Sequence, residues 1–243
     1  MEIIKHDKPK MPKITMNCDG SIDYKLEAQG EAIETCFSRP NFTIFSGGMG
    51  SGKTSFLLSM LKGPLRKTHH CIFVIIPEIS LHSISEADNV FKKYEGHGVI
   101  IYNELTPEIL EEIYSAVTAN AQMDMYSMLL VDDFGPLLKQ KQITFMLERF
   151  VTKMRHLKLG QIWILAQNYF QIPKKLRELG TNVLAWNTNK SQNKKLFLEQ
   201  FQCSEDMFNK IIKQAPTTHD WILLNLKYKR LFNKDWNEIK ISD

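Results

Sequence analysis

The sequence is poor in cysteine, and its cysteines lie far apart. The four residues are Cys18, Cys36, Cys71 and Cys203, and no two of them form a Cys-x-x-Cys pair. Structural zinc sites depend on closely spaced ligands, and disulfide frameworks occur in small secreted chains that are dense in cysteine. The sequence therefore argues against both, and we expect free thiols.

Long apolar runs are also missing. A helix that crosses a bilayer needs about 20 mostly apolar residues, and no stretch of this chain approaches that length. Residues 1–13 mix Lys, His, Asp and Pro without the apolar segment of a secretory signal. We expect no membrane span, no secretion signal, a reducing compartment and a mobile arm at the N-terminus.

Neither sign of charge dominates. Lys and Arg outnumber Asp and Glu by 31 to 27, which gives a net charge of +4 and a pI near 8.7. This balance is compatible with a nucleic-acid partner but too weak to demonstrate one. With 243 residues, no internal repeat and 43% hydrophobic residues, the chain has the size and composition of one globular domain.

Short apolar or β-branched runs alternate with amphipathic stretches from Asn41 onward. This alternation predicts an α/β fold with a mostly parallel central sheet flanked by helices. The strands are expected at 42–46, 71–77, 99–102, 128–132, 161–166 and 182–186. Helices are expected at 53–61, 107–119 and 142–157, the last of these with Gly160 as a left-handed cap.

The pattern changes at both ends of this core. We divide the chain into an N-terminal arm and lead-in segment (1–40), a core (41–190) and a small C-terminal elaboration (191–243). The lead-in segment could supply a strand or hairpin over 14–40, with its turn at 17–21. The elaboration is expected to contain a helix at 205–213 and strands at 219–226 and from Tyr228.

A phosphate-binding motif follows the first predicted strand. Residues 47–54 read Gly-Gly-Met-Gly-Ser-Gly-Lys-Thr, which fits G-x-x-x-x-G-K-[ST] between a strand and a helix. Such a P-loop aims backbone N–H groups at phosphate oxygens, while Lys53 reaches the β and γ phosphates and Thr54 binds Mg²⁺. The sequence therefore predicts a P-loop ATPase that binds ATP and Mg²⁺ through Gly47, Gly48, Met49, Gly50, Ser51, Gly52, Lys53, Thr54 and Ser55.

Two carboxylates end the strand at 128–132. Strand ends in open α/β sheets face the ligand crevice, so Asp132 is predicted to hold the magnesium shell with Thr54. Asp133 is predicted to orient or deprotonate the attacking water. A solvated strand end beside the turn at 134–136 is the alternative interpretation.

The strand at 161–166 ends in Gln167. In the additional-strand class of P-loop ATPases this strand lies between those of the two earlier motifs, so Gln167 is predicted to sense the γ-phosphate or the attacking water. The alternative is an amide that only caps the strand.

Two arginines are candidates for a positive charge offered to a neighbouring subunit's nucleotide. Arg155 is expected in the last turn of the helix before the sensor strand, and Arg177 follows Ile172-Pro173. An arginine in this role stabilises charge on the γ-phosphoryl group in the transition state. A solvated or salt-bridged helix residue is an equal interpretation for either, and His156 is expected to be structural.

Basic residues cluster toward the C-terminus, and some have aromatic neighbours. Basic loops that neutralise phosphates bind nucleic acid without reading sequence, although charge runs are more often solvated faces. The three clusters are Lys174, Lys175 and Arg177; Lys190, Lys194 and Lys195; and Lys227, Lys229, Arg230 and Lys234.

Taken together, four motifs resemble the genome-packaging ATPases of poxviruses, giant DNA viruses and virophages, in the FtsK-HerA superfamily. They are Phe-Ser-Gly-Gly-Met-Gly-Ser-Gly-Lys-Thr at 45–54, Leu-Leu-Val-Asp-Asp-Phe-Gly at 129–135, Arg-His at 155–156 and Ile-Leu-Ala-Gln-Asn-Tyr at 164–169. The resemblance spans about 41–187 and includes the segment 172–177. Many superfamily relatives carry Glu where this chain has Asp133, which bears on the general-base role of that residue.

The resemblance implies a ring of five or six subunits that drives double-stranded DNA into a preformed viral capsid, at the capsid or portal vertex. It places the protein in an infected host cell, in the cytoplasm or virus factory, or with the virion. The alternatives are a DNA translocase or helicase of a mobile element or conjugation system, and a scaffold that binds nucleotide without turnover. A GTP-dependent switch is disfavoured, because the segment Asn189-Lys190-Ser191-Gln192 lacks the carboxylate that reads guanine.

Overall fold

The computed structural model describes residues 1–6, 31–65 and 68–240. Within them, one ten-stranded sheet runs through the molecule in the order β1-β10-β9-β8-β7-β2-β6-β5-β3-β4. Its parallel part consists of β2 (Asn41–Ser46), β3 (Cys71–Ile75), β4 (Val99–Tyr102), β5 (Ser127–Asp132), β6 (Leu159–Ala166) and β7 (Asn182–Trp186). The fold is the predicted α/β class, and each predicted core strand is confirmed to within two residues.

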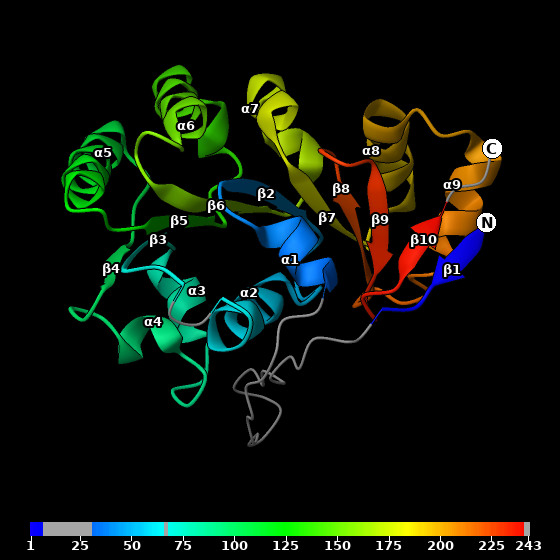
Figure 1. The fold of residues 1–243 in the computed structure, drawn as a ribbon, viewed down its shortest axis with the longest axis horizontal. Coiled ribbons are helices and arrows are strands. Elements are labelled where there is room, and N and C mark those ends of the chain that lie inside the picture. Colours follow the sequence, from blue (N-terminus) through cyan, green and yellow to red (C-terminus); the bar gives the residue numbers. More distant parts are fainter. Residues whose placement is uncertain (7–30, 66–67, 241–243) are drawn as a thin grey trace.

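Helices cover both faces of the sheet (Figure 1). One face carries α5 (Pro107–Gln122), α6 (Lys141–Lys153), α7 (Lys174–Leu179), α8 (Lys190–Phe201) and α9 (Glu205–Ile212), and the other carries α1 (Glu31–Phe37), α2 (Lys53–Lys62), α3 (Glu78–His82) and α4 (Val90–Lys93). Alternate side chains of a strand pack on opposite faces. In β2, Ile44 belongs to the core beneath α5–α9, whereas Phe45 belongs to the core beneath α1–α4.

The C-terminal strands extend the same sheet with antiparallel neighbours. β8 (Trp221–Asn225) pairs with β7, β9 (Arg230–Asn233) pairs with β8, and β10 (Glu238–Lys240) pairs with β9. β1 (Glu2–Ile4) pairs with β10. The predicted mobile arm is therefore wrong for residues 2–4, because β10 offers them an open edge to pair with.

The lead-in prediction is wrong where it can be compared. Residues 31–37 form helix α1 instead of a strand or hairpin, because Ala32, Ile33, Cys36 and Phe37 recur at helical spacing and are buried together. The predicted turn at 17–21 lies outside the described residues, as does Cys18. Cys36, Cys71 and Cys203 are free thiols, as expected.

Helix α6 ends earlier than predicted, at Lys153. Met154 and Leu157 are buried in the turns that follow, so the apolar spacing continues past the last residue of the helix. Gly160 is not a helix cap: it lies in β6, and a Cβ there would come within 2.6 Å of the Arg39 side chain and 2.7 Å of the His69 ring. The positive φ after the helix belongs to Lys158 instead.

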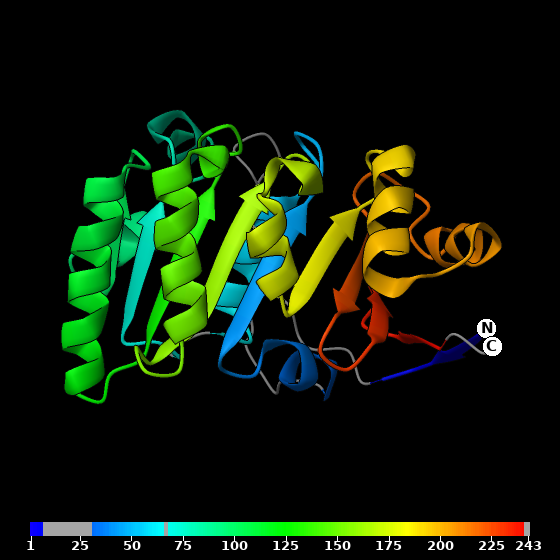
Figure 2. The same cartoon turned by 90° about the horizontal axis from the view of Figure 1, so that it is seen from above.

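Helix α8 is the largest element that the sequence pattern did not predict. Only Asn193, Leu196 and Phe197 are buried along it, so it has too few regularly spaced apolar residues to be predicted as an amphipathic helix. It begins at Asn189, whose side chain accepts a hydrogen bond from Gln192 N. Its first residues therefore lie beside the carboxyl end of β7, at the same end of the sheet as the P-loop (Figure 2).

Candidate nucleotide site

The carboxyl ends of the parallel strands gather most of the predicted site residues around one cavity. It has a volume of about 310 Å³. The predicted residues that line it are Met49, Gly50, Ser51, Gly52, Lys53, Thr54, Ser55, Asp132, Asp133 and Gln167. β6 lies between β2 and β5, which is why Gln167, after β6, lines the same cavity as the P-loop and the two carboxylates.

The P-loop requires glycine for two different reasons. Gly50 and Gly52 have φ values of 70° and 97°, a backbone conformation that favours glycine. Gly47 instead has no room for a side chain, because a Cβ there would come within 2.8 Å of Trp186 Cβ and 2.7 Å of Ser51 Oγ. Trp186 is buried, so the P-loop packs at Gly47 against a side chain of the core.

Lys53 is held by the loop itself. Its Nζ donates hydrogen bonds to the carbonyl oxygens of Gly47 at 2.6 Å and Gly48 at 3.0 Å. Burial lowers the pKa of Lys53, and the charges of Asp132 and Asp133 oppose this shift. An ammonium in this position can exchange its carbonyl partners for phosphate oxygens with a short movement.

Thr54 and Asp132 form a pair of oxygen ligands. Thr54 Oγ1 donates to Asp132 Oδ2 at 3.1 Å, and Asp132 is 7% exposed. Burial raises the pKa of Asp132 to about 6, against the hydrogen bond from Thr54 and the charge of Lys53. Within the described ranges, no three His, Cys, Asp or Glu side chains gather as a metal site. A hydroxyl and a carboxylate are oxygen groups of the kind that can hold Mg²⁺, which keeps waters and phosphate oxygens as its remaining ligands.

Asp133 and Gln167 meet at the rim of the cavity. Gln167 Nε2 donates to Asp133 Oδ1 at 3.1 Å, and both side chains are exposed. Asp133 has a φ of 62°, which Asp tolerates better than most residues. Asp133 and Asp132 both line the cavity, Asp133 in contact with Gln167 and Asp132 in contact with Thr54.

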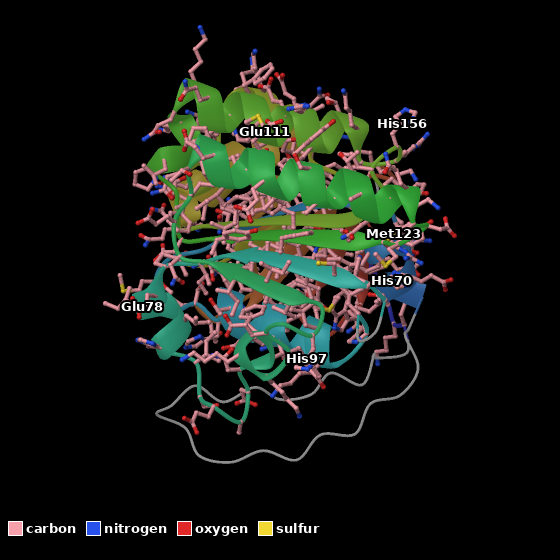
Figure 3. The ribbon with its side chains drawn as sticks, turned by 90° about the vertical axis from the view of Figure 1, so that its left-hand side faces the viewer. His70, Glu78, His97, Glu111, Met123 and His156 are labelled. Carbon is pink, nitrogen blue, oxygen red and sulfur yellow. The ribbon has the colours of Figure 1, made fainter. Side chains whose placement is uncertain are left out.

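The two arginines lie elsewhere. Arg155 is exposed and precedes β6, after the end of α6 and not in its last turn as predicted. Figure 3 shows its neighbour His156 at the end of the sheet opposite Glu78, which begins α3 near the cavity. Arg177 is 9% exposed, and its guanidinium lies 3.1 Å from Glu199 Oε1 and over the rings of Tyr169 and Phe170. Neither arginine reaches the nucleotide cavity of its own chain.

Three polar residues of the site were missed. Ser80 and Ser83, from α3 and the turn after it, line the cavity opposite the P-loop. Thr188 Oγ1 accepts a hydrogen bond from Gly48 N at 2.8 Å and so fixes the start of the loop. Each follows a parallel strand at its carboxyl end, which is the signal that could have identified them.

Carboxylates pair with many of the predicted basic clusters. Ion pairs join Lys174 to Glu178, Lys175 to Glu148, Lys194 to Glu205, Arg230 to Glu238 and Lys234 to Asp220. Among the residues that the structure describes, Lys190, Lys195, Lys227 and Lys229 have no carboxylate partner. They lie on α8 and in the turn between β8 and β9.

Two solved structures with a similar fold are those of B204 proteins from Sulfolobus turreted icosahedral viruses. The DNA-packaging ATPase B204 from Sulfolobus Turreted Icosahedral Virus superposes with a TM-score of 0.60 at 11% identity, covering 84% of this chain and 100% of that chain. The genome packaging NTPase B204 from Sulfolobus turreted icosahedral virus 2, in complex with AMPPCP, gives 0.58 at 15% identity, with 84% and 98% covered. At these identities the likeness shows the fold alone.

The sequence comparisons differ in what they find. No curated protein matches this chain. In residues 1–6, 31–65 and 68–240, no helix has the length and apolar character of a membrane span. The family model described as Poxvirus A32 protein matches residues 34–213, a region that contains the P-loop, both carboxylates, Gln167 and Thr188. The chain belongs to the poxvirus A32 protein family.

Proposed function

We propose that this protein is an ATP-hydrolysing DNA translocase that packages a double-stranded DNA genome into a viral capsid. The observation that carries the proposal is the meeting of Lys53, Thr54, Asp132, Asp133 and Gln167 around one cavity. Family membership and the packaging function of B204, which shares the fold, support the same conclusion.

The cavity supplies separate groups for binding and for hydrolysis. The P-loop amides and Lys53 bind the phosphates of ATP, and Thr54 and Asp132 would hold Mg²⁺, which neutralises phosphate charge when bound. Asp133 accepts a proton or hydrogen bond from the attacking water, and Gln167 fixes the Asp133 carboxylate through its amide. The charge that develops on the γ-phosphoryl group still lacks a positive partner on its far side.

A ring neighbour is the proposed source of that charge. Arg155 and Arg177 are the candidates, and neither lines the cavity of its own chain. Arg155 is exposed and free to reach a neighbour, whereas Arg177 is already held by Glu199. We therefore rank Arg155 first within a ring of five or six subunits that works at a capsid or portal vertex in the infected cell.

Duplex DNA should stimulate ATP hydrolysis, and this is the first test of the proposal. The rate is measured with duplexes of arbitrary sequence over a range of salt concentrations. DNA binding should weaken steeply with salt, because Lys and Arg contacts release counterions. A rate that DNA leaves unchanged at every salt concentration would support a nucleotide-binding scaffold instead.

Asp133→Asn tests the division of roles within the site. The variant should bind ATP with nearly wild-type affinity and hydrolyse it at least about 100-fold more slowly, the low end of a general-base contribution. Loss of ATP binding along with turnover would contradict the assignment. Stimulation by DNA together with assembly on capsids would separate a packaging motor from the translocase of a mobile element or conjugation system.

A further inference from the structure

A short turn joins the nucleotide cavity to the helices above the sheet. It begins at Gln167, which contacts Asp133, and continues through the 3₁₀ turn Tyr169–Gln171. Asn168 Oδ1 accepts from Phe170 N at 2.9 Å, and Gln171 Oε1 accepts from Asn168 N at 3.2 Å. These reciprocal bonds close the turn, so a displacement of Gln167 moves the turn as one unit.

The same turn touches the segment after β5 at a second place. A Cβ on Gly135 would come within 2.7 Å of Gln171 Oε1, so the Gln171 side chain packs directly on that backbone. Residues 133–135 and 167–171 are therefore in contact at Asp133–Gln167 and at Gly135–Gln171. A change at Asp133 when the γ-phosphate is lost would reach the turn through both contacts.

Phe170 connects the turn to two helices through its aromatic ring. Its ring lies 4.7 Å from the guanidinium of Arg177 on α7 and 4.8 Å from the ammonium of Lys195 on α8. Both distances are within the range of cation–π attraction. Arg177 is also paired with Glu199 of α8, so Phe170 lies beside the ion pair that joins α7 to α8.

This contact is not fully satisfied in the present arrangement. Tyr169 Oη and Arg177 Nε are buried, and neither has a hydrogen-bond partner within the described part of the chain. Buried polar atoms without partners raise the free energy of the arrangement that contains them. Both atoms lie where the turn meets α7, so a shift of the turn would change their surroundings.

We propose that Phe170 couples the nucleotide cavity to helix α8, so that ATP binding and DNA binding change each other's affinity. The inference rests on the proposed function, since it takes the exposed cations of α8 as contacts for DNA phosphates. Lys190 and Lys195 are exposed there and have no carboxylate partner among the described residues. Thermodynamic linkage requires the coupling to be equal in both directions.

The test measures this coupling as a ratio. The Kd for a labelled duplex is determined with and without AMPPCP, and the Kd for AMPPCP with and without the duplex, on the full chain. The wild-type ratio should lie between about 5-fold and 150-fold, the usual span of such couplings. In Phe170→Leu the ratio should fall to about 1, while each Kd measured alone changes by less than about 2-fold.

Matched variants separate the ring from a general loss of packing. Phe170→Tyr keeps the aromatic face and should keep the coupling. Phe145→Leu makes the same substitution at a 63% exposed position on α6 and should behave as wild type. On α8, Lys195→Met should lower the ratio, because the Lys195 ammonium lies over the Phe170 ring. Lys190→Met should weaken DNA binding and leave the ratio intact, because no such contact joins Lys190 to Phe170 among the described residues.

The outcomes distinguish this inference from the proposed function. If the wild-type protein binds both ligands and Phe170→Leu has the same coupling ratio as the wild type, Phe170 does not have the proposed role. If the thermal melting curve shows that Phe170→Leu is unfolded, the coupling ratios of Lys195→Met and Lys190→Met provide the test. An unchanged ratio in Lys195→Met then overturns the inference. Wild-type protein that does not bind DNA refutes the proposed function, and the coupling falls with it.

Discussion

The hydrogen bond from Gly48 to Thr188 offers a test of how the P-loop is held. Thr188→Val keeps the size and branching of the side chain and removes only the hydroxyl that accepts from Gly48 N at 2.8 Å. Gly48 N is partly buried and has no other hydrogen-bond partner within the described residues. Losing such a hydrogen bond costs about 0.5–1.5 kcal/mol of free energy, and more when the buried donor cannot bond to water instead.

This loss should appear mainly in nucleotide binding. In the free protein, Lys53 also holds the loop through the carbonyls of Gly47 and Gly48. When Lys53 turns to phosphate, those two bonds are lost, and Thr188 becomes the remaining side-chain contact at Gly48. A cost of about 1 kcal/mol corresponds to a loss of affinity of about 5-fold.

Isothermal titration with AMPPCP measures the effect, and Thr188→Ser is the matched control. The Ser variant keeps the acceptor and should bind within about 2-fold of wild type, since only a methyl group is lost. If the Val variant binds as tightly as wild type, Thr188 does not hold the bound loop. If the Ser variant is as weak as the Val variant, the methyl group matters and the hydroxyl does not.

Three further predictions concern turnover, assembly and acid stability. Lys53→Ala should abolish measurable ATP hydrolysis, because no other side chain of the P-loop brings charge to the γ-phosphate; wild-type turnover in a steady-state assay would contradict the site. Arg155→Ala subunits mixed with Lys53→Ala subunits should recover part of the activity, since intact sites then face intact arginines, and only summed residual rates under verified co-assembly would exclude Arg155. Although burial raises the pKa of Asp220, hydrogen bonds from Lys234 and Thr217 N hold it below its usual value. Its stabilisation is therefore present above about pH 3.9 and lost as pH falls through the folded pKa; chemical unfolding of wild type and Asp220→Asn should give curves that converge in acid, and a constant difference down to pH 2 would refute this.

The core of the fold could be predicted because its strands are buried on both faces. β5, β6 and β7 read as mostly apolar runs, β2 mixes apolar and polar residues, and every residue of these four strands is buried. The helices with dense apolar stripes, such as α5, were predicted for the same reason. Helix α8 escaped prediction because most of its surface faces solvent and its helical state depends on its cap and on two buried apolar residues.

The chain ends could not be predicted from local pattern. β1 is three residues long, and its state depends on β10, more than 230 residues away in the sequence. Helix α1 has a helical pattern, but only seven residues of it. Pairing across such separations is decided by which sheet edge remains open, and local residue preferences do not contain that information.

The chemistry of the cavity was determined by the sequence itself. Glycines, Lys53 and Thr54 at fixed spacing, and acids or amides at strand ends, form the pattern from which we propose a phosphate and magnesium site, since a parallel sheet brings those strand ends to one edge. What surrounds the cavity was decided only by the tertiary structure. Thr188 reaches Gly48, and Phe170 lies between Arg177 and Lys195, because strands and helices distant in sequence pack side by side. Arg177 shows the difference most clearly: its sequence position permits a role in a neighbour's active site, whereas its contacts with Glu199 of α8 and with the rings of Tyr169 and Phe170 follow from the tertiary structure.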